Sequence, residues 1–143
     1  MSIFSVPVSV HLMLINDNKI LLMRRKDTGF ADGFYSMPAG KLEPKESVEN
    51  AIIREVEEEI NINIKNETLK TIQVMNRNGS DRERIDYFFT VDRWSGEIKN
   101  NEPNKCDDLK WFDINNLPEN TIPYIKEAIN NYNKKIKFSL FGW

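Results

Sequence analysis

The sequence has few of the features that indicate disulfides, nucleic-acid binding or thiol catalysis. It holds 20 Lys and Arg against 22 Asp and Glu, a net charge of −2, so it lacks the basic surplus of proteins that bind duplex nucleic acid. Its single cysteine, Cys106, cannot form an internal disulfide, and nothing pairs it with the only histidine, His11. One cysteine favours a reducing, cytoplasmic location.

Long apolar runs are also missing. No segment approaches the eighteen or so consecutive apolar residues of a membrane span. The most apolar stretch, residues 3–15, has no Lys or Arg before it and no small-residue cleavage site after it, unlike a secretory signal peptide. Val6, Val8, Val10, Leu12 and Leu14 alternate within it, which predicts a half-buried strand. For 143 residues we expect one domain covering residues 1–143, monomeric or homodimeric, with no membrane attachment.

The remaining chain alternates strand-like and helical segments. Asn16, Asp17 and Asn18 predict a turn that joins the first strand to the second as a hairpin. The other elements expected are strands at residues 19–25, 34–37, 69–76, 84–94 and 109–113, polar loops at 28–33 and 95–108, and helices at 48–60 and 122–132. The apolar tail, residues 136–143, is expected to pack within the subunit, with a dimer as the alternative. Periodicity thus predicts an α/β or α+β fold.

The first helix carries the most informative pattern. Ser47 is a plausible N-cap, and Asn61 can end the helix in a left-handed conformation. Val48, Ile52, Val56 and Ile60 recur every four residues as a core-facing stripe. Glu55, Glu58 and Glu59 stand at i, i+3 and i+4, so their side chains share one face beside that stripe.

This arrangement of acids opposes local stability. Like charges at this spacing repel by a few tenths of a kcal/mol per pair, and carboxylates in a last turn oppose the helix dipole. Residues that oppose local stability in more than one way are found mostly at functional sites. A hard divalent cation would remove both penalties, although most acidic runs are simply solvated faces.

Residues 40–62, GKLEPKESVENAIIREVEEEINI, resemble the Nudix signature G-x5-E-x7-R-E-U-x-E-E-x-G-U, in which U is aliphatic. Gly40, Glu46, Arg54 and the glutamates at 55, 58 and 59 all match, and Asn61 replaces the final glycine. Because asparagine tolerates positive φ, the departure affects local stability more than chemistry. The resemblance implies the Nudix α/β/α sandwich, with a mixed sheet between helices, and Mg²⁺-dependent hydrolysis of a nucleoside diphosphate linked to another moiety.

The resemblance also implies roles for particular residues. Glu55, Glu58 and Glu59 would bind Mg²⁺, or Mn²⁺ as a substitute, together with the backbone carbonyl of Ala39. Glu55 or a neighbouring carboxylate would act as general base. Arg54 would orient these carboxylates by reaching Glu58 one turn away, with a surface ion pair as the alternative. Gly40 and Glu46 would shape the preceding loop.

A second resemblance, over residues 91–102, is to mutator-T-type nucleoside triphosphate pyrophosphohydrolases. It implies that Glu102, or alternatively Glu97, supplies a further metal ligand. Arg25 and Lys41 fall where such enzymes contact phosphate, and Arg82 where an arginine contacts the base. For each of these residues a solvated surface charge is the alternative.

The resemblance favours a nucleoside triphosphate, including an oxidised one, that is cleaved to a monophosphate and pyrophosphate. The alternatives are an ADP-ribose or nucleotide-sugar pyrophosphatase and a non-hydrolytic nucleotide-binding Nudix domain. A structural or adaptor module is a third class, which divalent metal would not stabilise. Four retained signature residues, Arg54, Glu55, Glu58 and Glu59, favour an enzyme.

Overall fold

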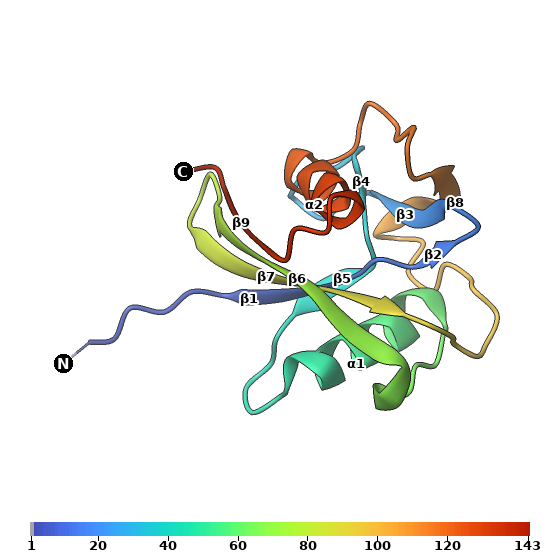
Figure 1. The fold of residues 1–143 in the computed structure, drawn as a ribbon, viewed down its shortest axis with the longest axis horizontal. Helices are drawn as coiled ribbons and strands as arrows, with labels where there is room; N and C mark the ends of the chain where they lie inside the picture. The colour runs from blue at the N-terminus through green and yellow to red at the C-terminus, as the bar shows by residue number, and fades with distance from the viewer. Residues whose placement is uncertain (1) are drawn as a thin grey trace.

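The computed structural model describes residues 2–143, which form two β-sheets and two α-helices (Figure 1). The elements in chain order are β1 (Val8–Leu12), β2 (Ile15–Asn16), β3 (Lys19–Arg25), β4 (Tyr35–Ser36), β5 (Ala39–Lys41), α1 (Val48–Ile60), the 3₁₀ turn Asn66–Thr68, β6 (Leu69–Asn78), β7 (Glu83–Val91), β8 (Cys106–Asp113), α2 (Pro123–Asn133) and β9 (Phe138–Phe141). Among residues 2–143 no helix is long and apolar enough to cross a membrane.

The larger sheet has five strands in the order β5-β1-β7-β6-β9 and is mixed. β1 pairs with β7 and β6 with β9 in parallel, whereas β1–β5 and β6–β7 are antiparallel. α1 and α2 cover opposite faces of this sheet (Figure 1), each over its own apolar cluster. The expected layered α/β fold with a mixed sheet between helices is confirmed.

The smaller sheet is centred on β3, which pairs with β2, β4 and β8. Asp17 and Asn18 both have positive φ (52° and 59°) in the turn that precedes β3, a conformation that Asp and Asn tolerate better than most residues. The turn therefore forms at the predicted residues, but the hairpin joins β3 to the short strand β2, whereas β1 belongs to the larger sheet. The two sheets bring the end of β3 and the loop that follows it close to α1.

The capping and packing of α1 agree with its sequence. The Ser47 side chain accepts a hydrogen bond from the Asn50 N–H, and Asn61 ends the helix with φ 67°. Ile52, Val56 and Ile60 are fully buried, while Val48 is only partly buried against the same cluster. The apolar stripe thus fixes which face of α1 is turned away from the core.

Three segments differ from the prediction. β5 forms at Ala39–Lys41, where no strand was expected, because these residues pair with β1. β8 begins at Cys106 rather than at residue 109, because its first residues pair with Arg24 and Arg25 of β3. The tail packs within the subunit as expected, but it does so as a strand, β9, in register with β6. A strand of four residues gains its order from the neighbouring strand, which local sequence patterns do not reveal.

Candidate active site

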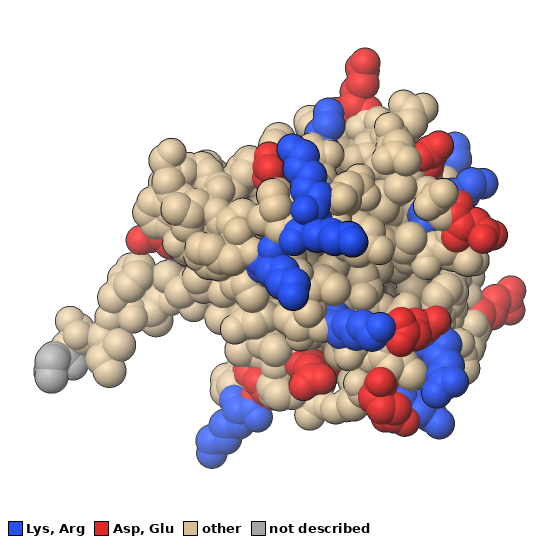
Figure 2. Space-filling model, in the orientation of Figure 1, with Lys and Arg blue, Asp and Glu red and all other residues tan. Residues whose placement is uncertain are grey.

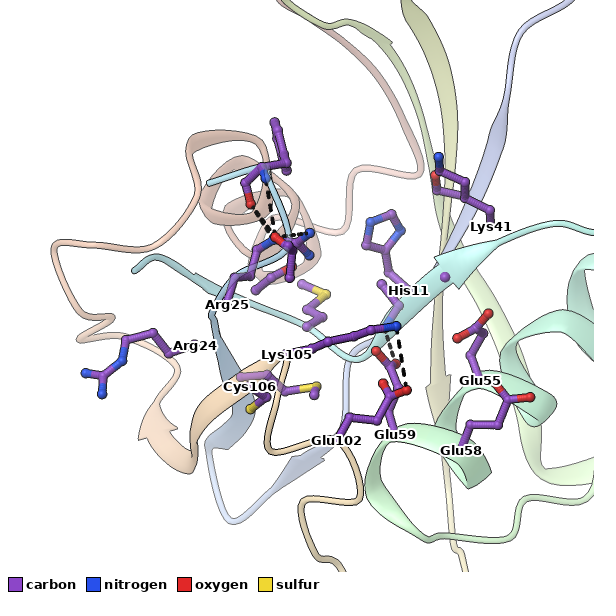
Figure 3. Close-up of a pocket in the computed structure, with 18 of the residues that line it drawn as sticks. His11, Arg24, Arg25, Lys41, Glu55, Glu58, Glu59, Glu102, Lys105 and Cys106 are labelled. Carbon is purple, nitrogen blue, oxygen red and sulfur yellow. Dashed lines mark hydrogen bonds and ion pairs between the residues drawn. The ribbon is translucent and has the colours of Figure 1, made fainter. Parts of the chain in front are cut away.

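A cleft of about 690 Å³ lies beside the carboxyl-terminal half of α1 (Figure 3). Its carboxylates are Glu43, Glu55, Glu58, Glu59, Glu102 and Asp27; its cations are Arg24, Arg25, Lys41, Arg54, Arg77, Arg84 and Lys105. His11, Phe30, Met37 and Tyr124 also line it. Glu55, Glu58, Glu59 and Glu102 gather at one part of the cleft, with Lys105 beside Glu102 (Figure 3). Acidic and basic side chains therefore share one cavity.

Arg54 joins the helix to the preceding loop. Its Nε and Nη2 donate to the two carboxylate oxygens of Glu46 at 2.8 and 3.0 Å, and Nη1 donates to Glu55 at 2.9 Å. Nη1 also lies 3.6 Å from a Glu58 oxygen, the contact that i,i+4 spacing predicts. The bidentate pair lowers the pKa of Glu46, because a neighbouring guanidinium favours the charged carboxylate. Arg54 thus positions Glu55, and Glu46 holds Arg54.

Gly40 makes room for the Glu55 carboxylate. A Cβ atom at residue 40 would lie 2.0 Å from Glu55 Cδ and 2.2 Å from Oε1. Gly40 does not have positive φ, so steric space rather than backbone conformation requires glycine here. The signature glycine and the signature glutamate, fifteen positions apart in the sequence, are therefore two halves of one contact.

The carboxylates at the buried end of the cleft are held in an unfavourable environment. Burial is the main cause that raises the pKa of Glu59 well above its ordinary value, and the nearby charge of Glu55 adds to it. Burial likewise raises the pKa of Glu55, against the opposing effect of Arg54. Within residues 2–143 one hydrogen bond compensates Glu59 directly, from the Ala39 N–H at 2.9 Å. Electrostatic cost of this kind is typical of sites that bind a cation or transfer a proton.

The donor set fits a hard divalent cation, because it consists of carboxylate oxygens next to the β5 backbone at Ala39. Within residues 2–143, however, no three His, Cys, Asp or Glu side chains already surround one point closely enough to hold a metal ion. The expectation that three glutamates converge is met only to the extent that they share the cleft. Glu55 is turned to Arg54, Glu59 to Ala39, and the Glu58 side chain is 55% exposed.

Three of the other predicted residues line the cleft and one does not. Arg25, Lys41 and Glu102 are among its lining residues. Arg82 is not: it precedes β7, and its guanidinium donates to the Ser5 carbonyl at 2.9 Å. The prediction that Arg82 contacts the base is therefore not supported by its position. Arg84, two residues later and inside β7, lines the cleft instead.

Sequence reasoning missed a buried polar network beside the same cleft. Nδ1 of His11 lies 3.2 Å from the Tyr87 carbonyl, which can only accept, so Nδ1 carries the proton and Nε2 accepts from the Tyr124 hydroxyl. The Arg77 guanidinium stacks 3.7 Å from the Tyr124 ring and donates twice to Asp86. These residues come from three strands and α2, so no local sequence signal links them.

Sequence reasoning also missed Phe30, which lies on the rim of the cleft with 47% of its surface exposed. Its loop is tied together by side chains: Arg25 donates to the Phe30 carbonyl at 2.7 Å, and Asp32 accepts from the backbone of Thr28 and Gly29. Arg25 also lies over the Phe30 ring. A glycine-containing loop before a short strand could have flagged this residue, since such loops often carry binding groups.

Comparison with known proteins is consistent with this geometry. Residues 6–132 match the family described as "NUDIX domain". The chain is 34% identical over 112 residues to an ADP-ribose pyrophosphatase of Methanocaldococcus jannaschii, covering 78% of this chain and 64% of that protein. It is 33% identical over 81 residues to an 8-oxo-dGTP diphosphatase of Proteus vulgaris, covering 57% of this chain and 70% of that protein.

Among solved structures, a MutT NUDIX hydrolase from Burkholderia pseudomallei superposes with a TM-score of 0.81 at 26% identity, covering 89% of this chain and 98% of that one. The chain thus spans just under two-thirds of the Methanocaldococcus relative and nearly all of the Burkholderia structure. The substrates named for the two curated relatives differ, so similarity alone leaves the substrate undetermined.

Proposed function

The chain belongs to the NUDIX domain family, and on that premise we propose that it is a divalent-metal-dependent hydrolase that cleaves a nucleoside triphosphate to a monophosphate and pyrophosphate. The observation that carries this proposal is the cleft beside α1, in which Glu55 and Glu59 have raised pKa values next to Glu58 and Glu102. A bound polyphosphate and cation would offset the charge that the fold brings together there.

Glu55, Glu58, Glu59 and Glu102, with the carbonyl of Ala39, would hold Mg²⁺, with Mn²⁺ as a substitute. When bound, such an ion would supply charge neutralisation at the diphosphate and would help to activate water. The protein's own contribution is positional. Arg54 fixes Glu55, which would hold this carboxylate in place as a ligand of the ion or as the proton acceptor for the attacking water.

The cations of the cleft support a substrate that carries several negative charges. Arg25 and Lys41 line it from β3 and β5, and Lys105 lies 4.0 Å from Glu102. Arg25 is close enough to Glu59 to act on its pKa, so a phosphate bound by Arg25 would lie next to the carboxylates. Beyond Arg25, Phe30 offers an exposed ring at the rim against which a base can stack.

The second candidate substrate is ADP-ribose. It is favoured by the 34% identity to the Methanocaldococcus ADP-ribose pyrophosphatase. A substrate panel separates the two: canonical and oxidised nucleoside triphosphates, ADP-ribose, nucleotide sugars and dinucleoside polyphosphates, each with Mg²⁺ or Mn²⁺. Pyrophosphate release from a triphosphate supports the first candidate, and ribose 5-phosphate with AMP from ADP-ribose supports the second.

The decisive variant pair is Glu58→Gln against Glu57→Gln. Both residues are exposed and adjacent on α1, but Glu58 lines the cleft beside Glu55, whereas Glu57 does not. We expect Glu58→Gln to lower kcat by roughly 10²–10⁴-fold, the usual contribution of a group that handles a proton or binds the catalytic ion. Glu57→Gln should retain wild-type turnover. Unchanged turnover in Glu58→Gln would remove the assignment of this helix to catalysis.

A further inference from the structure

The carboxyl-terminal strand leaves both an open sheet edge and an apolar face. β9 is the last strand of the five-stranded sheet and pairs only with β6 among residues 2–143. The Val74 N–H donates to the Lys137 carbonyl, and in a parallel ladder such bonds involve alternate residues. The N–H and C=O groups of Phe138 and Leu140 therefore point to the open edge, where another strand can pair with them.

The side chains of the same two residues are uncovered. Phe138 is 62% exposed and Leu140 61%. Register places Phe138 beside Val74 and Tyr87, on the face of the sheet that α1 covers farther along. α1 does not reach this end, because it lies under β1 and β5 (Figure 1). We call the exposed side chains of Phe138, Leu140 and Trp143 the tail surface.

The amino-terminal arm near this end of the sheet is also apolar. The amino-terminal residues Ile3 and Phe4 are 88% and 74% exposed. They precede β1, whose start pairs with the start of β7, so they lie at the same end of the sheet as the end of β9. Figure 2 shows few acidic or basic side chains over this end of the molecule, on the side where the chain ends lie.

We propose that the tail surface is a homodimer interface, in which β9 of one copy pairs antiparallel with β9 of a second copy and the sheet continues across the subunits. A two-fold axis relates identical strands in antiparallel orientation, so each copy offers the same edge and face to the other. This interface lies away from the cleft and does not depend on the proposed reaction.

The charges next to β9 favour this orientation. Lys134, Lys135 and Lys137 precede the strand, and the residues after Phe141 are Gly142 and Trp143. Residues directly opposite each other in an antiparallel pair both turn their N–H and C=O groups to the partner, so Phe138 of one copy lies opposite Leu140 of the other and Lys137 lies opposite Phe141. The Lys137 residues of the two copies are then about 13 Å apart along the strands, beyond the screening length of about 8 Å at physiological salt. Parallel pairing would bring them together.

The available area is that of a weak, reversible dimer. At the observed exposure each large side chain of the tail surface offers on the order of 100 Å². Three such side chains from each copy give roughly 600 Å² in total, below the standard size of specific interfaces, so the backbone pairing of the two strands has to supply part of the binding. We therefore expect a dimer that dissociates on dilution rather than a permanent one.

The strand is firmly held, so a second copy would meet a preformed edge. Trp143 donates from its indole N–H to the Asn76 carbonyl at 2.9 Å, and Asn78 donates to the Gly142 carbonyl. Gly142 has φ 82°, and a Cβ atom there would lie 2.5 Å from the Asn78 oxygen. Because the tail is ordered within its own subunit, pairing costs little further conformational entropy.

The test is the mass of the wild-type protein by sedimentation equilibrium from low micromolar to near-millimolar concentration. We expect a monomer–dimer equilibrium, with twice the 16.8 kDa chain mass at the upper end. Leu140→Glu and Phe138→Glu should raise the dissociation constant at least tenfold. The matched control is Phe34→Glu, which changes a residue that is 40% exposed and should leave the constant unchanged. Circular dichroism melts establish that each variant is folded.

Hydrogen exchange supplies a second readout that does not depend on substitution. The amides of Phe138 and Leu140 should become protected as concentration rises, while the amides at the exposed tip of the β6–β7 turn should not. A wild-type protein that stays monomeric throughout would overturn the proposal. So would a dimer that Leu140→Glu and Phe138→Glu leave intact, or a monomer whose tail binds anionic lipid vesicles instead.

Discussion

On the α2 side of the five-stranded sheet, Arg77 donates two hydrogen bonds to Asp86, and His11 is bonded at both ring nitrogens. On the α1 side, Glu59 is partly buried, and within residues 2–143 its carboxylate accepts only from the Ala39 N–H while another acid, Glu55, lies close by. Both sides contain ionisable groups withdrawn from solvent, but only on the α2 side is each of them paired. Buried polar groups with a structural role are hydrogen-bonded, whereas groups in unfavourable electrostatic environments are typical of binding and catalytic sites.

The largest expected change in stability is on the α2 side, where the buried charges are paired. Asp86 is fully buried and Arg77 nearly so, so Asp86→Asn would leave a guanidinium without its counter-charge. We expect the free energy of unfolding to fall by about 3–5 kcal/mol, the usual cost of breaking a buried pair from one side. Urea denaturation of both proteins measures it. A change below 1 kcal/mol would mean that this network is less important to the fold than the α1 side.

A pH dependence on the same side is the next largest effect. Burial lowers the pKa of His11, so the folded protein keeps this imidazole neutral while the unfolded chain takes up a proton near pH 6.5. The unfolded state therefore binds more protons in that range, and stability is lost as the pH falls below about 6.5. The slope attributable to one such group is at most about 1.4 kcal/mol per pH unit.

The His11 contribution can be isolated with His11→Gln, which removes the titrating group and retains an acceptor and a donor. Unfolding free energies measured from pH 7.5 to pH 5 should decline less steeply for the variant than for the wild type. Parallel declines would show that the imidazole titrates alike in both states, against the burial seen here.

On the α1 side we expect a substitution to raise the free energy of unfolding rather than to lower it. Glu59→Gln removes a charge whose pKa is raised by burial and by Glu55, and the amide oxygen can still accept from Ala39. Without divalent metal we expect a gain of about 1 kcal/mol in unfolding free energy, typical of substitutions that relieve a functional site. The stabilisation that Mg²⁺ gives the wild type should be reduced or lost. Thermal melts with and without Mg²⁺ measure both, with the exposed Glu57→Gln as the control.

The smallest effect concerns the residue that departs from the Nudix signature. Asn61→Gly would relieve the positive φ of 67° but would delete the hydrogen bond from the Asn61 amide to the Glu97 carbonyl at 2.9 Å. The two terms are each of order 0.5–1 kcal/mol and opposite in sign. Chemical denaturation should therefore show a net change within about 0.5 kcal/mol, and turnover should be retained. A much larger loss would mean that Asn61 holds the loop leading to Glu102.

Local sequence patterns were sufficient to predict α1 and the turn before β3. Ser47, Asn61 and the four-residue apolar repeat fixed the ends and the buried face of the helix, and Asn16 to Asn18 fixed the turn before β3. These signals act between residues that are close in the sequence, so their physical basis does not depend on the rest of the fold. The same holds for the contact between Arg54 and Glu58, one helical turn apart.

Patterns of this kind could not locate the rest of the cleft. Arg82 and Arg84 are equally basic and two residues apart, and only the start of β7 decides which one faces the cavity. No sequence pattern links His11, Arg77 and Tyr124, because they come into contact only when β1, β6 and α2 pack together. β9 was missed as a strand because its pairing partner lies more than sixty residues earlier.

The sequence by itself determined the helix, its caps, the family and the identity of the acids, because spacing along one helix sets which side chains share a face. Tertiary structure decided how unfavourable those acids are, which cations accompany them and what the tail pairs with. Burial, dielectric environment and strand register arise only when distant segments pack together, and each changes the properties of a residue without changing its identity.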